Sequence, residues 1–339
     1  QIKKKEGIQM EKITSNDSLK GIVEKILKER KSIQSVFFVG CGASRSDLHP
    51  AYYFLNNNAQ KLRASVHTAE EFNLAMPKAV NEHAVVICCS LGGSTPETAK
   101  STKLAKEKGA YVVSFTHTEG SAITEFADEV ILFDWANNGY ASKMDKMIKV
   151  LYLATEILQQ TEGYEHYEKM LNAFEKIYPA INNAVKTVRP EAKVFAEKYK
   201  DVDILYVMSS GATQEVAWSF SSCLMMEMQW IASSTFNSGD FFHGPFEMVE
   251  ENVPYLLFMN EGPTREMDAR AMTFLQRFNT NYTVVDSKDY GLSGIVGKEV
   301  VEYFDPVIIC SVTRIYAEEL ATIRNHPLTK RRYMWKLEY

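Results

Sequence analysis

One glutamate lies on the apolar face of a helix expected over residues 211–231. Val216, Phe220, Cys223 and Glu227 recur at spacings of four, three and four residues, as the side chains of one helical face do. A carboxylate among methionines and a tryptophan should have a raised pKa, because burial penalises its charged form. Such a group suits a general base working near neutral pH. A buried glutamate paired with an arginine fits the same spacing, so both interpretations stay open.

A histidine follows in a stiff turn. His243 lies within the sequence Gly-Asp-Phe-Phe-His-Gly-Pro, where glycine and proline aim a side chain rather than bury it. Imidazole exchanges a proton at physiological pH, so His243 is a candidate acid or base, although a lone histidine is often structural. Asp240, His243 and Glu247 could be drawn as metal ligands, yet no cysteine or second histidine lies nearby. We therefore expect no metal, and the acids can cap the next helix.

Two turns rich in glycine and hydroxyl groups could bind an anion. In the first, Gly-Cys-Gly-Ala-Ser-Arg over residues 40–45, Arg45 occupies the place where a dinucleotide-binding fingerprint requires its third glycine. A nicotinamide cofactor is therefore not expected. Gly42, the Ser44 hydroxyl and the free N–H groups of the following helix would instead attract an anion. A tight turn capped by Ser44 is the structural alternative.

The second turn begins at Ser90 and again leads from an apolar strand into a helix. It carries Gly92, Ser94 and Thr95, with Pro96 at a favourable first helical position. A phosphate monoester needs several N–H and O–H donors, which these residues can supply. A Ser/Thr cap with flexible glycines is the alternative. Two such turns in one open α/β sheet favour a phosphate site, because ligands of such sheets bind beyond the carboxyl ends of the strands.

The C-terminal segment, Arg-Arg-Tyr-Met-Trp-Lys-Leu-Glu-Tyr, is aromatic and basic where chain ends are usually polar and frayed. We expect it to be docked on the protein. It could fold over the active site, with Lys336 offering a positive charge, or it could serve as a surface anchor. The pattern does not separate these alternatives.

The elements that must position these groups form two similar series. Apolar runs alternate with helical stretches such as 96–108 and 142–160 in the first half of the chain, which predicts a parallel α/β layer. A helical stretch over 168–199, broken by Pro179 and Pro190, connects it to the second half. Strands are expected at 35–40, 63–67, 84–90, 110–116 and 129–134, and again at 203–209, 254–259, 282–286 and 307–310.

The series repeat at the level of sequence. Ser-Val-Phe-Phe-Val-Gly-Cys-Gly-Ala-Ser from residue 35 and Asp-Ile-Leu-Tyr-Val-Met-Ser-Ser-Gly-Ala from residue 203 both run from a strand through a small-residue turn into a helix. We predict an α/β protein with two doubly wound parallel-sheet domains related by duplication. The expected parts are a first domain at 15–165 that carries the phosphate-binding turns, a helical connection at 166–200, a second domain at 201–325 and a tail over the active site at 326–339.

Length and composition limit the class of protein. A chain of 339 residues exceeds what one hydrophobic core usually organises, and 45% hydrophobic with 24% charged residues is ordinary globular usage. The net charge of −5, with scattered basic residues, speaks against nucleic acid as a partner. The apolar run 84–89 is far shorter than the roughly 18 residues of a membrane helix.

Cysteine usage and the chain start bear on the compartment. Five cysteines without CxxC spacing argue against a disulfide framework or a zinc ribbon, and reduced thiols in a cytoplasm fit best. The basic start lacks the apolar region of a secretory signal. Met10 is a candidate for the true start, so residues 1–9 need not be native.

Together these motifs resemble a known family. The paired turns, followed by Met-Met-Glu-Met-Gln-Trp and Gly-Asp-Phe-Phe-His-Gly-Pro-Phe-Glu, are similar to the sugar isomerase (SIS) phosphosugar-binding fold in its double-domain, flavodoxin-like form. The isomerase half of glucosamine-6-phosphate synthase shares that form. The stretches LQQTEGYEHY, MEMQWI and HPLTKRRYMWKLEY resemble one branch more closely, the Amadori-phosphate deglycases that act on 6-phosphofructosyl amino acids.

The resemblance implies roles for the residues. It makes Glu227 the proton-transfer base and His243 the acid that opens the sugar ring, contributed by the neighbouring subunit of an obligatory homodimer. It implies a sugar phosphate as the small-molecule partner, and neither cofactor nor metal. It places the phosphate on Ser44, Ser90 and Thr95. Gly42, Gly92 and Ser94 of the same two turns complete the expected phosphate site, and Glu71, Asp240 and Lys336 are expected as further substrate-binding residues.

The implied reaction is a hydrolysis by proton transfer, which releases glucose 6-phosphate and a free amino acid. An aldose–ketose phosphosugar isomerase is the nearest alternative, and a non-catalytic sugar-phosphate sensor is an alternative from another class. Such a sensor would have no reason to hold both Glu227 and His243. Three residues depart from the family pattern. Asp240 stands where the deglycases usually have glutamate, and Ser94 where they have a polar residue such as asparagine. Gly92 stands where related isomerases often have serine. The released amino acid and the sugar isomer therefore stay open.

Overall fold

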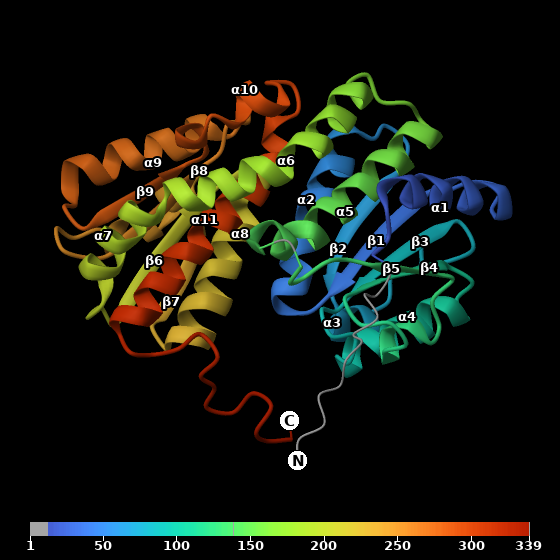
Figure 1. The fold of residues 1–339 in the computed structure, drawn as a ribbon, viewed down its shortest axis with the longest axis horizontal. Helices are drawn as coiled ribbons and strands as arrows, with labels where there is room; N and C mark the ends of the chain where they lie inside the picture. The colour runs from blue at the N-terminus through green and yellow to red at the C-terminus, as the bar shows by residue number, and fades with distance from the viewer. Residues whose placement is uncertain (1–12, 138, 339) are drawn as a thin grey trace, which may run out of the picture.

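The computed structural model describes residues 13–137 and 139–338, so the question of Met10 as the start lies outside the described residues. The chain forms two parallel β-sheets in two halves, with helices between and around them (Figure 1). The first half contains α1 Asn16–Glu29, β1 Ser35–Gly40, α2 Gly42–Asn58, β2 Arg63–Thr68, α3 Ala69–Leu74, β3 Ala84–Cys89, α4 Pro96–Glu107, β4 Tyr111–Thr116, β5 Glu129–Leu132 and α5 Gly139–Thr161.

Two helices connect the halves, α6 Tyr167–Thr187 and α7 Arg189–Tyr199. The second half contains β6 Ile204–Ser209, α8 Gln214–Ser219, the π-helix η3 Phe220–Gln229, β7 Ala232–Asn237, the 3₁₀ turn η4 Asp240–His243, β8 Tyr255–Met259, α9 Arg265–Phe278, β9 Tyr282–Asp286, α10 Leu292–Val296 and α11 Val301–Ile323. The boundaries expected near 165, 200 and 325 stay predictions.

The two sheets share one topology. Their strand orders are β2-β1-β3-β4-β5 and β7-β6-β8-β9, so each half places its strands in the doubly wound flavodoxin-like order, and the second lacks a fifth strand. All strand pairs are parallel, with Gly40 opposite Cys89 at the carboxyl ends of β1 and β3. The fold class expected from the sequence is confirmed. The order reverses between β1 and β3, and this switch point is where such sheets bind ligands.

Eight of the nine expected strands are present, and the ninth is wrong. The run 307–310 lies inside α11, a helix whose residues are buried on most sides. A short apolar run fits a buried helix as well as a buried strand, which explains the error. Strand β7 was not expected, because its sequence Ala-Ser-Ser-Thr-Phe-Asn is small and polar at the edge of its sheet.

The helices also differ from expectation in two places. Pro190 separates α6 from α7 as predicted, but α6 continues through Pro179. Buried side chains on both sides of this proline, including Phe174, Ile177 and Ile181, hold the helix against its neighbours and outweigh the lost hydrogen bond. The helix expected over 211–231 is divided into a 3₁₀ turn, α8 and the π-helix η3.

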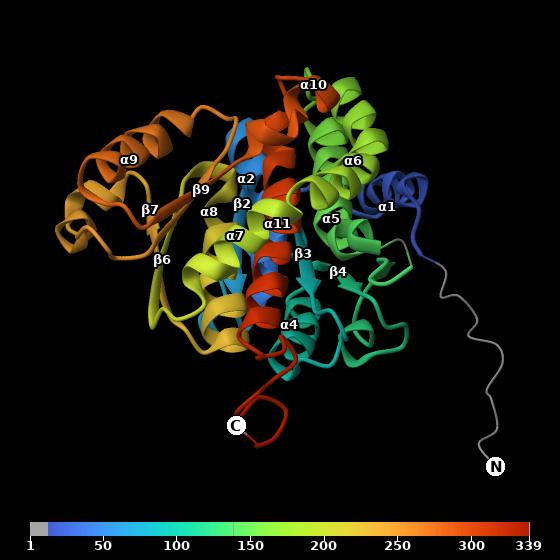
Figure 2. The same ribbon diagram turned by 60° about the vertical axis from the view of Figure 1, so that its left-hand side comes forward.

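One large hydrophobic core spans the two halves, and each half also has a smaller buried cluster of its own. Alternate residues of β1 serve different clusters: Val36 and Phe38 face the shared core, whereas Phe37 and Val39 face α3 and α4. The shared core also contains Leu205 of β6 and many residues of α5, α6, α7 and α11. Helix α11 runs back between the sheets and closes this core (Figures 1 and 2).

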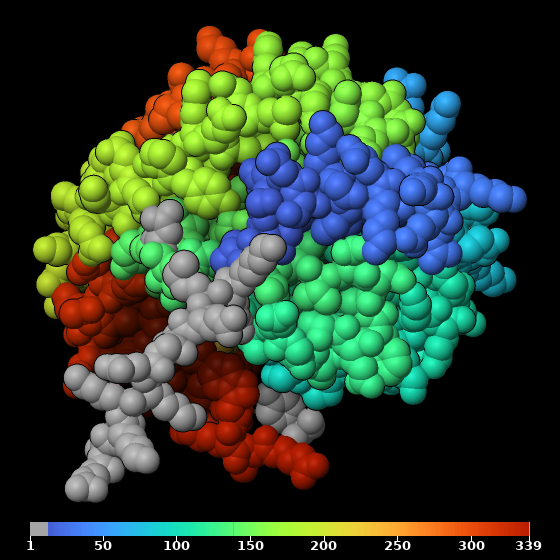
Figure 3. Space-filling view, turned by 45° about the vertical axis from the view of Figure 1, so that its right-hand side comes forward, coloured from blue at the N-terminus to red at the C-terminus, as the bar shows by residue number. Residues whose placement is uncertain are grey.

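The space-filling view shows how segments of the two halves meet on one face of the molecule (Figure 3). Helix α1, in blue, packs on α5 at the outside of the first half, and the red C-terminal segments lie beside the green segments of the first half (Figure 3). In the described part of the chain, no helix is long and apolar enough to cross a bilayer.

Candidate active site

The first glycine turn lies at the switch point of the first sheet. Gly42 has a φ of +53°, and a Cβ added there would meet no atom within 4 Å. Helix α2 starts at this glycine, and its N-cap residue, Cys41, makes no side-chain capping hydrogen bond. The expected Ser44 cap is therefore not the arrangement seen, since Ser44 N–H donates to the Cys41 carbonyl at 3.1 Å. A side chain at Gly42 would thus enter open space at the start of α2.

The second turn follows β3, the neighbour of β1 in the sheet. The hydroxyls of Ser90 and Thr95 lie 2.9 Å apart, so these two predicted residues do converge. Thr95 is the N-cap of α4, and no side chain caps this helix either. Gly93, with a φ of +68°, packs so closely on Ser121 that a Cβ would lie 1.9 Å from its hydroxyl. The turn is thus held in place, while Gly92 and Ser94 are exposed.

A buried lysine lies beneath the first turn. Lys146 of α5 is 3% exposed, forms an ion pair with Asp47 at 2.6 Å and donates to the Ser44 hydroxyl at 3.5 Å. Burial acts to lower the pKa of Lys146, but Asp47 and Cys89 outweigh it and the pKa is raised. The lysine is therefore charged at neutral pH, and it orients a hydroxyl predicted to bind phosphate.

The corresponding turn of the second half is filled. Gly211 matches Gly42 in position and has a φ of +56°, but a Cβ there would lie 2.3 Å from the Thr264 hydroxyl. The Asn260 amide donates to the Ser210 carbonyl at 3.1 Å and to the Thr264 hydroxyl at 3.0 Å. Side chains thus occupy the space that stays open in the first half.

Glu227 lies on the π-helix η3, one turn after Cys223. Its side chain is 24% exposed, and its carboxylate forms an ion pair with Arg331 at 2.7 Å. Burial raises the pKa of Glu227, and Arg331 opposes this shift without cancelling it. The raised pKa predicted from the helical spacing is confirmed, and the arginine partner of the alternative interpretation is present as well.

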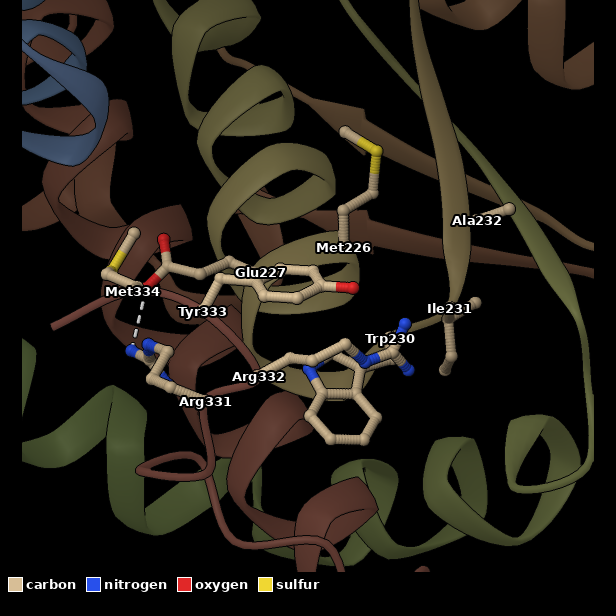
Figure 4. A pocket seen from close by; sticks show the side chains of 9 residues that line it. All are labelled: Met226, Glu227, Trp230, Ile231, Ala232, Arg331, Arg332, Tyr333 and Met334. Carbon is tan, nitrogen blue, oxygen red and sulfur yellow. Dashed lines mark ion pairs between the residues drawn. The ribbon is translucent and has the colours of Figure 1, made fainter. Parts of the chain in front are cut away.

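Glu227 and Arg331 line a cavity of about 610 Å³ between η3 and the C-terminal tail. Figure 4 shows the two side chains meeting at one end of it, with Tyr333 between them and Trp230. The other lining residues are Met226, Trp230, Ile231, Ala232, Arg332, Tyr333 and Met334. A titratable carboxylate therefore faces a largely apolar space that can admit a small molecule.

The π-helix also connects this cavity to the first turn. Cys223 and Ala43 line one small cavity of about 90 Å³ between the halves, together with Ser219. Arg45 reinforces the contact by pairing with Glu215 of α8 at 2.9 Å. The residue that breaks the dinucleotide fingerprint thus joins the two halves next to the site.

His243 lies far from Glu227 of the same chain. Glu227 precedes the amino end of β7, where Ala232 is opposite Ile204, and His243 follows the carboxyl end, where Asn237 is opposite Ser209. A strand of six residues spans about 20 Å. His243 and Asp240 are both exposed on η4. Within residues 13–137 and 139–338, Asp240, His243 and Glu247 do not form a metal-ligating group.

The remaining predicted residues lie at separate places. Glu71 is exposed in the first turn of α3, where it acts to raise the pKa of His67 against the larger, lowering effect of burial. Lys336 is exposed and donates to the Arg331 carbonyl at 2.6 Å, so it holds the turn of the tail that carries Arg331. It does not line the cavity of Glu227.

Comparison with known proteins gives this geometry a family. Residues 30–142 match the SIS domain model. Over 310 residues the chain is 36% identical to fructosamine deglycase FrlB of Bacillus subtilis, an alignment that covers 91% of this chain and 94% of the relative. This chain belongs to the SIS family. It is also 25% identical over 283 residues to fructoselysine 6-phosphate deglycase of Escherichia coli, covering 82% of this chain and 80% of that protein.

Solved structures support the same SIS assignment. A candidate phosphosugar isomerase from Salmonella typhimurium superposes with a TM-score of 0.91 at 37% identity, covering 96% of this chain and 99% of the other. A second candidate phosphosugar isomerase, from Bacillus subtilis, has a TM-score of 0.90 at 35% identity, covering 95% and 97%.

Sequence reasoning missed two residues of this SIS site. Arg331 reaches Glu227, whereas we had expected charge from Lys336 in the same tail. Lys146 was overlooked because it lies in α5, a helix in which 17 residues are buried and most of them are apolar. A lysine inside such a buried run was the available signal, since lysines are rarely buried without a partner.

Proposed function

We propose that this chain is a deglycase that hydrolyses a 6-phosphorylated Amadori compound to glucose 6-phosphate and a free amine. The observation that carries the proposal is the half-buried Glu227, with its raised pKa, beside a cavity large enough for a small molecule. The similarity to FrlB and to fructoselysine 6-phosphate deglycase over most of the chain supports this reaction.

The phosphate group would bind at the switch point of the first sheet. Ser44, Ser90 and Thr95 would donate hydroxyl hydrogen bonds, and the N-termini of α2 and α4 would offer backbone N–H groups. Lys146 supports this proposal, because it places a buried positive charge on Ser44. These contacts anchor the substrate and orient its carbons without taking part in the chemistry.

Glu227 would transfer the proton between adjacent carbons. Its carboxylate removes a proton from C1 of the open-chain ketoamine. The electron pair forms a double bond between C1 and C2, and the C2 carbonyl oxygen takes up a proton from solvent, which gives an enaminol. Return of a proton to C2 gives a Schiff base between C1 of the sugar and the amine. Water then adds to C1 and the C1–N bond breaks, which releases glucose 6-phosphate and the amine. This sequence needs an acid–base group of tuned pKa and moves no electrons to an acceptor.

His243 would open the sugar ring at the site of a second subunit. The separation of His243 from Glu227 by the length of β7 supports a homodimer in which each site takes its histidine from the partner chain. Exposure of Asp240 and His243 on the surface of one chain fits the same arrangement. A reducing cytoplasm is the proposed compartment, supported by five free thiols, of which Cys88 and Cys89 are fully buried.

The test is to incubate the protein with a panel of 6-phosphofructosyl amines and measure the release of glucose 6-phosphate. Glu227→Gln should reduce turnover by roughly 10²–10⁴-fold, because an amide cannot accept the proton. Glu319→Gln is the matched control. The Glu319 side chain is 21% exposed and forms an ion pair with Arg189 at a distance of 3.6 Å, and neither residue lines the cavity. Interconversion of fructose 6-phosphate and glucose 6-phosphate without release of amine would instead assign an isomerase.

A further inference from the structure

The cavity beside Glu227 contains positive charge that the proposed reaction does not use. The guanidinium of Arg332 lies 4.3 Å from the centre of the Trp230 ring, and the Lys330 ammonium lies 4.9 Å from it. Neither forms an ion pair with a carboxylate in the part of the chain that the structure describes. Arg331 is different, because Glu227 neutralises it. The region therefore has two uncompensated cations around one aromatic ring.

The charges lie at different ends of the cavity. The Glu227 carboxylate points toward Met334 and Arg331, whereas the Arg332 side chain runs along Trp230 on the side of Ile231 (Figure 4). Most of the wall between them is apolar, with Met226 and Ile231 among the lining residues. A ligand with its reacting carbon at Glu227 would thus reach Arg332 with a group several bonds away from that carbon.

Trp230 gives Arg332 a defined position. The tryptophan ends the π-helix with a φ of +58°, a left-handed conformation that is unusual for a bulky residue. Its ring is 37% exposed and forms a platform on which the planar guanidinium stacks. A guanidinium held in this way keeps its edge donors free for a bidentate acceptor, and it loses little further freedom on binding. A carboxylate matches that fork.

We propose that this cavity holds the amine half of the substrate and that Arg332 binds a carboxylate on it. The inference rests on the proposed function and assigns a residue, Arg332, to the carboxylate that an amino-acid leaving group carries. The substrate would then have an anion at each end, with its phosphate at the turns of the first sheet and its carboxylate at Arg332. The reacting C1 and C2 carbons would lie between these anchors, at Glu227.

The test uses pairs of substrates that differ only by a carboxylate. One pair is the 6-phosphofructosyl derivative of lysine, linked through the side-chain amine, and that of cadaverine, which is lysine without its carboxylate. The other pair, glycine and methylamine, covers linkage through the α-amine. We expect kcat/KM to favour the carboxylate member of at least one pair by roughly 10–100-fold, as for a hydrogen bond to a charged group. The difference should be mainly in KM.

Arg332→Met should bring that ratio close to one, and Arg332→Lys should restore part of it, because lysine keeps the charge but not the fork. The matched control is Arg277→Met. Arg277 also stacks on an aromatic ring, 4.9 Å from the centre of Phe278, but lies on α9 away from the cavity. The control should keep the ratio of the unaltered protein. Circular dichroism and the unfolding midpoint would establish that each variant folds.

The outcomes separate this inference from the proposed function. Equal turnover of both members of each pair by the unaltered protein would overturn the inference and leave the deglycase function standing. A preference for carboxylates that persists in Arg332→Met would overturn the role of Arg332. If Arg332→Met lowered kcat/KM equally for both members of a pair, the role of Arg332 would also be overturned. Such a result would point to a general structural effect or to phosphate binding. Failure to release glucose 6-phosphate from any compound would overturn the proposed function itself.

Discussion

The Glu227 carboxylate is subject to two opposing influences. Burial raises its pKa, and the Arg331 guanidinium, 2.7 Å away, acts to lower it. Because burial is the larger influence, the group remains a stronger base than a free carboxylate. Arg331 limits this rise in pKa, which favours the ionised form of Glu227 that can accept a proton. Arg331 thus acts as a positioning residue for the base.

Arg331→Met should move the pH profile of the enzyme. A general base works when it is deprotonated, so kcat/KM falls as pH drops through its pKa. Removal of the guanidinium leaves burial unopposed and raises the pKa of Glu227 further, which shifts the acidic limb of kcat/KM to higher pH. A pH–rate series measures this limb. The control is Arg189→Met, whose partner is Glu319. An unchanged limb in Arg331→Met would show that the ion pair does not tune the base.

The sequence predicted residue chemistry where it depends on neighbours along the chain. The raised pKa of Glu227 followed from its place among apolar side chains of one helix. The sequence allowed an arginine partner for Glu227 but did not indicate which arginine, because Arg331 lies far along the chain in the C-terminal tail. The same tail suggested Lys336 as the useful charge. Which of two nearby cations reaches a carboxylate depends on the backbone turn between them, here closed by Lys336 on the Arg331 carbonyl.

At the scale of elements, two glycines begin equivalent turns in different surroundings. Gly42 and Gly211 follow β1 and β6, the first strand of each half along the chain, and have nearly equal positive φ angles, +53° and +56°. A side chain at Gly42 would enter open space, whereas one at Gly211 would collide with Thr264. Both turns thus need a residue that adopts a positive φ. Of the two, the turn at Gly211 also needs a residue without a Cβ.

Gly211→Ala should destabilise the protein more than Gly42→Ala. Both substitutions place alanine at a left-handed φ, at a cost of about 1–2 kcal/mol. Gly211→Ala adds a contact of 2.3 Å with the Thr264 hydroxyl, and overpacking of this kind costs roughly another 1–3 kcal/mol. Chemical denaturation measures both losses, and Thr264→Ala should recover part of the second. Equal losses would contradict the filled turn.

Gly42→Ala should in turn weaken binding of glucose 6-phosphate, because its methyl group projects into the space proposed for the phosphate. Calorimetric titration of the folded variant measures this effect. Gly211→Ala is the comparison, since the turn of the second half faces its own side chains instead of ligand. Unaltered affinity in Gly42→Ala would place the phosphate elsewhere.

The limits of sequence prediction for elements have physical causes. Strands buried on both faces, such as β1 and β3, gave clear apolar runs and were predicted within a residue. The run 307–310 gave the same signal from a helix buried on most sides. Strand β7 gave no signal, because an edge strand takes its stability from pairing with β6. A π-helix at 220–229 has no distinctive composition, so it could not be expected.

At the scale of the whole molecule, the two proposed catalytic groups of one chain lie at opposite ends of β7. Glu227 precedes the amino end of this strand, and His243 follows its carboxyl end and is exposed. The resemblance implied this sharing between subunits, but no pattern in the sequence indicated it. The shared core of the two halves was likewise unpredictable, since it depends on how α11 folds back between the sheets.

Mixing two inactive variants should restore activity if the site is shared. Glu227→Gln and His243→Ala each disable both sites of their own homodimer. A mixed dimer has one site with both unaltered groups and one with neither, because a two-fold interface exchanges the contributions. Random exchange makes about half of the dimers mixed, so recovery should approach a quarter of full activity. Mass spectrometry verifies the exchange. Exchange without recovery would place both groups in one chain or remove His243 from catalysis.

The filled turn of the second half has a consequence for how substrate and folding are linked. A ligand stabilises the state that binds it, by an amount that rises with the logarithm of the ligand concentration above its dissociation constant. The turns at Gly42 and Ser90 leave room for a ligand, whereas the turn at Gly211 is filled by Thr264. Amide hydrogen exchange near these turns should slow as glucose 6-phosphate is added, whereas amides near Gly211 and Asn260 should exchange at constant rates. The amides of the first-half turns would then gain protection from exchange as substrate concentration rises. The equivalent turn of the second half would keep the same protection at all concentrations, because the side chains of Thr264 and Asn260 always fill it.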